Sequence, residues 1–201
     1  MPTPTSSRPT PERLLDAAET LMRTVGLANT TTKAIAREAG CSEAALYKHY
    51  ANKEELFVRV LMERTADAGP LMAALTAEPG EGGTLDALTD IALHASLFYA
   101  EAMPMAASLF AEPALLTRHR EGVQRIGAGP HVVRDALAGR LRRELDAGRL
   151  RPGADPGAAA ALLLGACFQR AFFLHFSGAE SVEPVEEFAP AVARTLWAAI
   201  G

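Results

Sequence analysis

The sequence contains few of the residues that cross-link a chain or anchor it in a membrane. Its only cysteines are Cys41 and Cys167, which excludes a disulfide framework and is typical of a protein whose thiols stay reduced. No secretory hydrophobic segment opens the sequence, and the longest apolar run, residues 158–168, is shorter than the roughly 20 residues that cross a bilayer. We therefore predict a cytoplasmic protein without membrane contact, in which this run forms a buried helix.

The patterns that mark catalytic and metal sites are also lacking. Neither the five histidines nor the two cysteines show paired ligand spacing, and no glycine-rich phosphate loop or nucleophile elbow occurs. We expect no catalytic residues, no bound metal and no cofactor, and therefore no enzyme.

The charge is unevenly distributed along the chain, although its sum is small. The net charge is −4, which alone argues against a nucleic-acid partner. Residues up to Lys53 carry seven basic and five acidic side chains, so this part is +2 and the remainder is −6. A mildly basic N-terminal part on an acidic body is weak support for DNA binding.

The sequence predicts helices almost throughout, because apolar residues recur at spacings of three and four rather than two. We therefore expect an all-α protein of about nine helices. The first spans residues 10–26, with Thr10 as its N-cap and Pro11 in its first turn. The second and third span residues 31–40 and 42–50.

The remaining helices follow from cap residues and breaks. Asn52 caps the fourth helix, with Glu55 as its capping-box partner, and Pro70 is expected to end or kink it. The segment 127–130, rich in glycine, divides or distorts a long charged helix. Five further helices are expected over residues 84–102, 104–111, 115–147, 156–176 and 184–200.

The second and third predicted helices form a helix-turn-helix. Both are short, and a turn that contains Gly40 separates them; the second helix of such a pair can enter a major groove about 12 Å wide. Leu46 and Tyr50 lie one turn apart and attach this helix to the core, which leaves its opposite face free. Plain helical bundles also contain such hairpins, so the spacing alone leaves both interpretations open.

The residues of this region are more specific than their spacing. The stretch 31–57, TTKAIAREAGCSEAALYKHYANKEELF, closely resembles the signature of the TetR family of regulators, above all in Leu46-Tyr-Lys-His-Tyr50 and Asn52-Lys-Glu-Glu-Leu56. The resemblance starts at Glu12 and continues for about 45 residues. It implies a three-helix DNA-binding head, a fourth helix that links the head to a larger helical body, and a dimer formed mainly by the last two body helices.

The resemblance also assigns DNA contacts to individual residues. The expected phosphate ligands, which fix register without reading sequence, are Tyr47, His49 and Lys53. The expected base-reading residues are Ala44, Ala45 and Lys48, together with Glu43, which lies on the free face of the same helix. Of these, lysine can donate to guanine, alanine can meet a thymine methyl group, and glutamate can accept from cytosine. Thr32 and Lys33, at the start of the second helix, complete the predicted set.

The body is expected to form the dimer. Residues 147–156 resemble the turn that precedes the family's penultimate helix. Two reading helices about one DNA turn apart would match a palindrome. The apolar stripe after this turn builds either a symmetric interface or an intramolecular core, and its predicted interface residues are Leu162, Gly165, Phe188, Val192, Leu196 and Trp197.

The body is also expected to hold a ligand. Aromatic and methionine residues at helical spacing either line a pocket or fill the core. Arg170 either orients an anionic or carbonyl-bearing ligand or pairs with an acid across the dimer. The stretch around Arg140, Arg142 and Arg143, interleaved with Glu144 and Asp146, is expected to be a solvated helix face. The candidate pocket residues are His94, Phe98, Tyr99, Met103, Met105, Phe110, Phe168, Arg170, Phe172 and His175.

These predictions divide the chain into a tail (1–9), a helix-turn-helix DNA-binding domain (10–53) and a helical effector-binding and dimerisation domain (54–201). The expected function is that of a homodimeric repressor, released from a palindromic operator by a small, largely apolar effector. The alternative is an effector-independent, architectural DNA-binding protein. A helical enzyme or interaction protein with a repurposed head is the rival from another class, and the lack of a catalytic constellation argues against it.

Overall fold

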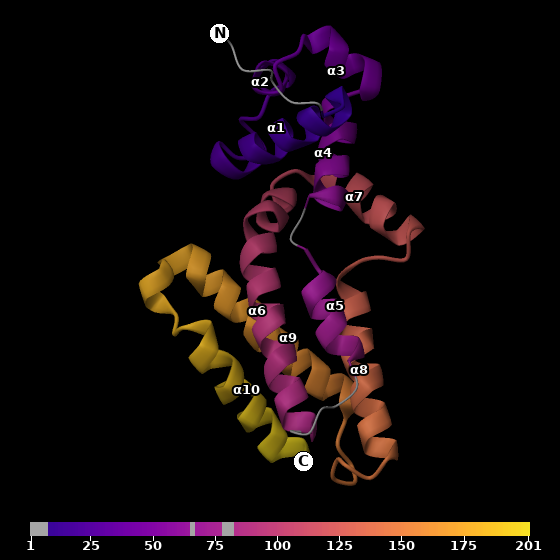
Figure 1. Ribbon diagram of the computed structural model, residues 1–201, viewed down its shortest axis with the longest axis vertical. Helices are drawn as coiled ribbons and strands as arrows, with labels where there is room; N and C mark the ends of the chain where they lie inside the picture. The colour runs from indigo at the N-terminus through magenta and orange to yellow at the C-terminus, as the bar shows by residue number, and fades with distance from the viewer. Residues whose placement is uncertain (1–7, 65–66, 78–82) are drawn as a thin grey trace. The chain divides into compact units, whose positions relative to one another are not determined.

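The computed structural model describes residues 8–64, 67–77 and 83–201. Ten α-helices and one short 3₁₀ helix form in these residues, without a strand, which confirms the all-α prediction (Figure 1). The elements are α1 (Thr10–Thr24), α2 (Thr32–Glu38), α3 (Glu43–His49), α4 (Lys53–Glu63), α5 (Gly69–Thr76), α6 (Gly83–Phe110), α7 (Pro113–Arg125), α8 (Pro130–Asp146), α9 (Pro156–Ser177), η1 (Ala179–Ser181) and α10 (Val185–Ile200).

Polar side chains cap the N-termini of several of these helices, and Asn52 does so as predicted. The Asn52 side chain accepts the backbone N–H of Glu55 at 2.8 Å at the start of α4, and Asp155 caps α9 in the same way. The prediction for α1 is wrong in detail. The helix already includes Thr10, and Pro9 precedes it without a side-chain cap.

Two prolines act differently from the prediction. Pro70 does not end α4, which already stops at Glu63; it lies in the first turn of α5, where its missing N–H would have no helical partner. Two helices were expected within residues 84–111, but α6 continues unbroken with Pro104 inside it. The segment 127–130 divides α7 from α8, as predicted.

His175 compensates for the proline inside α6. Because proline has no N–H, the carbonyl four residues before Pro104, that of Ala100, loses its helical hydrogen bond. His175 of α9 donates from Nε2 to this carbonyl oxygen at 2.7 Å. A bond from a neighbouring helix thus replaces the missing helical one, so the carbonyl keeps a partner.

Replacing His175 with alanine is expected to lower the free energy of unfolding by about 1 kcal/mol, because the Ala100 carbonyl loses its partner. The loss should vanish in a Pro104→Ala background, since the new N–H bonds the same carbonyl. Denaturant unfolding of the four proteins of this cycle measures the coupling. His94→Ala serves as the control, because it also removes a histidine, but one whose neighbour is Asp90, at 3.4 Å, rather than the Ala100 carbonyl. Equal losses from His175→Ala in both backgrounds would contradict the compensation.

The helices form two compact units, which are described separately. The head unit lies within residues 1–65 and 105–123. In it α1 contacts α2, α3 and α4, around a core in which Leu14, Leu46 and Leu56 have no exposed surface. The end of α6 and the start of α7 add Met105, Leu109 and Leu115 to this core. The head unit is therefore larger than the helix-turn-helix segment, and the functional division of the chain near residue 53 stays a prediction.

The body unit lies within residues 66–104 and 124–201. Its α9 contacts both α8 and α10 (Figure 1), and one face of α9, including Leu163 and Cys167, is buried in the body core. Among the described helices, α9 is the one that is long and apolar enough to cross a membrane by length and composition. Its buried face is what a core helix of a folded protein requires.

The charged face predicted on α8 is only partly solvated: Arg142, Arg143 and Asp146 are exposed, whereas Arg140 and Glu144 are buried. Arg140 and Glu144, one turn apart, are only 4% and 3% exposed, because neighbouring elements supply polar partners. Arg140 donates to carbonyl oxygens at the end of α5, among them that of Ala74 at 3.4 Å. Glu144 accepts from the Thr84 hydroxyl of α6 at 2.7 Å, and from Arg149 at 2.7 and 3.0 Å. α8 therefore holds both the end of α5 and the start of α6.

The stability of the body unit is expected to depend on this carboxylate. The hydrogen bonds from Arg149 lower the pKa of Glu144 from 4.5 to about 2, because they favour the ionised form. A lowered pKa in the folded state means that the carboxylate stabilises the fold above pH 4.5 and loses this effect as the pH falls toward 2.

The measurement is the difference in free energy of unfolding between the native protein and Glu144→Gln. We expect this difference to shrink by about 2 kcal/mol between about pH 6 and about pH 3. Glu186→Gln, on the exposed part of α10, is the control and should show no such change. A difference that stays constant over this range would show that Glu144 does not stabilise the fold as an ion.

Candidate nucleic-acid interface

The third helix is attached to the head core along one side and open to solvent along the other. Leu46 is fully buried, and Tyr50, one turn later, is 5% exposed. The Tyr50 hydroxyl donates to the Pro11 carbonyl oxygen of α1 at 3.4 Å, and burial raises the pKa of Tyr50. Gly40, with φ +64°, gives the turn before α3 a conformation that side chains resist. The turn and these two side chains set the orientation of α3.

Arg13 of α1 holds the end of α2, a role that the sequence pattern did not indicate. Its guanidinium donates to the Ala39 carbonyl oxygen at 3.0 and 2.7 Å, and to that of Gly40 at 3.1 Å. Carbonyls at the end of a helix have no helical partner, so Arg13 stabilises the turn between α2 and α3. The contact joins distant parts of the sequence, and no local spacing rule reveals it.

The predicted DNA-binding residues all lie in the head unit, and none of the nine is buried. Tyr47, on the outer side of α3, is 52% exposed. The other exposed members are Lys33, Glu43, Ala44, Lys48 and His49. The partly buried members are Thr32, Ala45 and Lys53. The structure places them at the starts of α2 and α4 and along α3, and their contact with DNA stays a prediction.

Three of these residues have side-chain partners in the free protein. Lys53 Nζ lies 5.1 Å from the centre of the Phe57 ring, a cation–π contact that holds the ammonium group at the start of α4. The Thr32 hydroxyl donates to Glu43 Oε1 at 2.5 Å. This bond connects the first residue of α2 to the first residue of α3.

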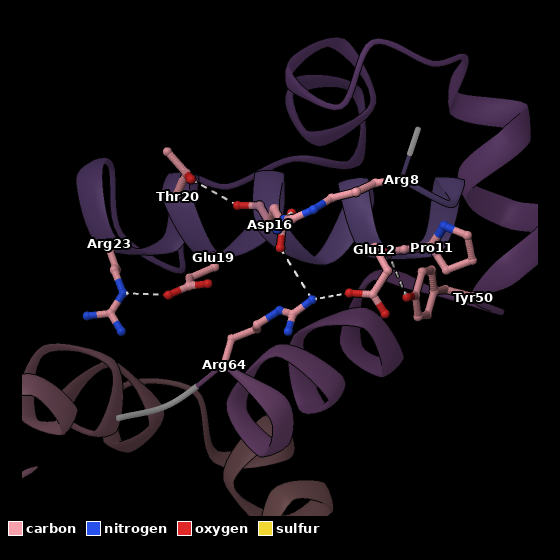
Figure 2. A network of polar contacts seen from close by, with 9 residues as sticks. All are labelled: Arg8, Pro11, Glu12, Asp16, Glu19, Thr20, Arg23, Tyr50 and Arg64. Atoms are coloured by element: carbon pink, nitrogen blue, oxygen red, sulfur yellow. Dashed lines mark hydrogen bonds and ion pairs between the residues drawn. The ribbon is translucent and has the colours of Figure 1, made fainter. Parts of the chain in front are cut away.

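A network of charges fastens α4 to α1 (Figure 2). Arg64, directly after α4, binds the Glu12 carboxylate and lies 3.3 Å from Asp16. Arg8 pairs with the same aspartate at 2.8 Å. The hydrogen bond to Glu12 raises the pKa of Arg64, which stays a cation. Since Lys53 begins α4 and Arg64 follows its end, the network fixes the helix that carries a predicted phosphate ligand.

In the body unit, the structure brings some of the predicted pocket residues together. Tyr99 of α6 has its ring centre 5.5 Å from that of Phe98 and 5.6 Å from that of Phe168 of α9, and burial raises the pKa of Tyr99. Met105 and Phe110 do not belong to this group. Both lie in the head unit, where Met105 is in the core and Phe110 is 75% exposed.

The other predicted pocket residues have separate surroundings. Phe172 stacks on Phe176 with ring centres 5.2 Å apart, and Met103 is buried within α6. Arg170 donates to the Glu183 carbonyl oxygen at 2.7 Å and lies over the Phe188 ring at 5.7 Å. These partners of Arg170 belong to its own chain, and a role toward a ligand or a partner's acid stays a prediction.

The face of α9 opposite the body core is apolar and exposed. We call it the α9 surface; its residues are Leu162, Gly165, Phe168, Phe172, Phe173 and Phe176. Leu162 is 66% exposed and Phe176 is 77% exposed. Phe173 and Phe176 were not among the predicted interface residues, and their exposure becomes evident only in the folded chain.

The predicted interface residues on α10 are less exposed. Leu196 is 6% exposed and lies in the core of its own unit, because it shares a helical stripe with Ala189 and Ala193. Leu196 therefore packs within its own chain, and its prediction as an interface residue is wrong. The partly buried members, which pack against the same core, are Phe188, Val192 and Trp197.

Two sequence comparisons agree with the geometry of the head. Residues 14–60 match the profile of a family described as bacterial regulatory proteins, tetR family. Over 65 residues, 32% of the chain, the sequence is 38% identical to YvkB of Bacillus subtilis, an uncharacterized HTH-type transcriptional regulator. This match spans only 34% of the length of that relative.

Solved structures share the fold of nearly the whole chain. A protein from Mesorhizobium loti, described as a TetR-family transcriptional regulator, has a TM-score of 0.74 at 20% identity and covers 96% of both chains. SmeT, the repressor of the Stenotrophomonas maltophilia multidrug efflux pump SmeDEF, has a TM-score of 0.65 at 23% identity, covering 96% of this chain and 91% of its own. FadR of Bacillus subtilis, in complex with stearoyl-CoA, has a TM-score of 0.66 at 15% identity, covering 94% and 99%. At these identities the likeness is one of fold.

Proposed function

Because residues 14–60 match the profile of bacterial regulatory proteins of the tetR family and nearly the whole chain shares the fold of a solved TetR-family regulator, we propose that the protein is a transcriptional repressor that binds a palindromic operator as a homodimer. The observation that carries the proposal is that α3 is buried on one side and exposed on the other. Leu46 and Tyr50 fix one side of this helix in the head core, while Tyr47 and Lys48 stand exposed on the other. A short helix presented in this way can enter a major groove and reach base edges.

The α9 surface supports the homodimer. Four exposed phenylalanines and Leu162 on one helix form a patch of the kind that marks protein–protein interfaces. A symmetric pairing across this surface would use the same residues in both copies. A palindromic operator offers one half-site to the α3 helix of each copy, and the half-site centres lie about 34–36 Å apart for one DNA turn.

We further propose that a small, largely apolar molecule bound in the body unit releases the operator. The rings of Phe98 and Phe168 contact the ring of Tyr99, and such an aromatic group with one hydroxyl is suited to bind an apolar molecule. α6 carries two of these residues, and its last residues, including Met105, belong to the head core. Fold relatives include a repressor of a multidrug efflux pump and a regulator that holds stearoyl-CoA.

An effector-independent DNA-binding protein is the second candidate. It shares the exposed α3 but needs no coupling between the body and the head. The two candidates differ in linkage, because only a ligand-released repressor loses operator affinity when a compound binds the body.

Selection of bound duplexes from a random DNA pool, at fixed salt, tests the proposal. We expect an enriched palindrome whose half-sites are about one DNA turn apart. That duplex then serves as the probe in a screen for compounds that release it. Failure to enrich any sequence would reject a sequence-specific regulator.

A further inference from the structure

The side-chain bond between Thr32 and Glu43 has no role in building the helices that it joins. The backbone at the start of α2 is capped by Thr31, whose hydroxyl accepts the Ala34 N–H at 3.2 Å. The backbone at the start of α3 is capped by Ser42, which accepts the Ala45 N–H at 3.1 Å. Neither Thr32 nor Glu43 lies in the head core. The pair is therefore available for a role at the surface.

A carboxylate on this surface needs a physical reason. DNA is a polyanion, so Glu43 repels the phosphates that the nearby cations attract. The positive end of the α3 dipole offsets part of this repulsion, because Glu43 is the first residue of the helix. The Thr32 hydroxyl donates to Glu43 Oε1 at 2.5 Å, which holds the carboxylate in one orientation and leaves Oε2 as an acceptor.

The acceptor has one well-matched partner among the base edges of the major groove. Cytosine presents the N4 amino group as a donor, whereas guanine and thymine present acceptors that repel a carboxylate. Adenine has a donor at N6, but its neighbour N7 is an acceptor. A fixed carboxylate therefore favours cytosine.

We propose that Thr32 positions the Glu43 carboxylate and that the pair selects cytosine at one position of each half-site. This inference rests on the proposed function, since it requires α3 to enter the major groove. Thr32 then acts as a positioning residue for Glu43, rather than as the phosphate ligand that its place at a helix start suggests.

The experiment repeats the random-pool selection with the native protein, Glu43→Gln, Thr32→Val and Thr32→Ser. Affinities are then measured for the selected duplex and for duplexes with the cytosine pair replaced by each other pair. The native protein should prefer cytosine by about tenfold or more. Thr32→Val, which keeps the shape but lacks the hydroxyl, should lose most of this preference at that position alone. Thr32→Ser should retain it.

Glu43→Gln gives an independent readout. Glutamine donates and accepts at once and suits the N6 and N7 edge of adenine, so the preference should move from cytosine toward adenine while affinity for unrelated DNA rises. A cytosine preference that survives Glu43→Gln would overturn the inference. A uniform loss for all duplexes in Thr32→Val would instead make Thr32 a phosphate ligand. If the native protein enriches no sequence at all, the proposed function itself fails.

Discussion

Tyr47→Ala is expected to weaken binding to the selected operator about ten- to a hundredfold, through loss of a phosphate contact in each half-site. Tyr47 is 52% exposed and is not part of the head core, so the free energy of unfolding should change by less than about 0.5 kcal/mol. Fluorescence anisotropy at fixed salt measures the affinity, and denaturant titration measures the stability.

Phe110→Ala is the matched control for this prediction, because Phe110 is an exposed aromatic residue of the head unit at the end of α6. It should leave operator affinity unchanged. Tyr47→Phe separates the hydroxyl from the ring and should lose affinity if the hydroxyl binds a phosphate. Full affinity in Tyr47→Ala would mean that the exposed side of α3 does not face DNA.

Leu162→Glu is expected to separate the homodimer and to lower operator affinity by about a hundredfold or more. A glutamate at position 162 of the α9 surface would have to be buried without a partner when two copies meet across this surface. Loss of the dimer also removes the effective concentration that a second linked head supplies, which is worth about 10²–10⁴ in affinity. The protomer itself should stay folded, since Leu162 is 66% exposed.

Analytical ultracentrifugation measures the mass, and a titration of the operator measures the affinity. Ile126→Glu is the control, because Ile126 is an apolar residue of the body unit that is 64% exposed but lies outside α9. It should leave both the mass and the affinity unchanged. A Leu162→Glu protein that remains dimeric would place the interface elsewhere.

Local signals in the sequence predicted the helices and the helix-turn-helix well. Cap residues such as Ser42 and Asn52 act on N–H groups three residues away, so a short stretch of sequence contains both partners. The DNA-reading surface follows from the same kind of pattern, since Leu46 and Tyr50 define the buried side of α3 and leave Tyr47 outside.

The features that the sequence did not predict depend on partners far along the chain. Pro104 breaks a helix by local rules, but His175 of α9 supplies the bond that lets α6 continue. Arg140 and Glu144 appeared to belong to a solvated face, because their partners on α5 and α6 are more than 50 residues away. Spacing reveals which residues share a face and leaves open what covers that face.

The same limit applies to α9 and α10. Both have apolar stripes, and periodicity alone does not tell a stripe that packs within its own chain from one that faces a partner. Leu196 proved to be core, whereas Phe176 at the end of α9 is 77% exposed. The exposed fraction in the folded chain separates these two cases.

One titration tests the central claim most directly. The purified protein is titrated, at one salt concentration, with the selected operator and with a scrambled duplex of the same length and composition. A dimeric, sequence-specific regulator should bind two protomers per operator and prefer it by about 10³ or more over the scrambled duplex. Equal affinity for both duplexes would contradict base reading by α3 and leave only nonspecific attraction to phosphates.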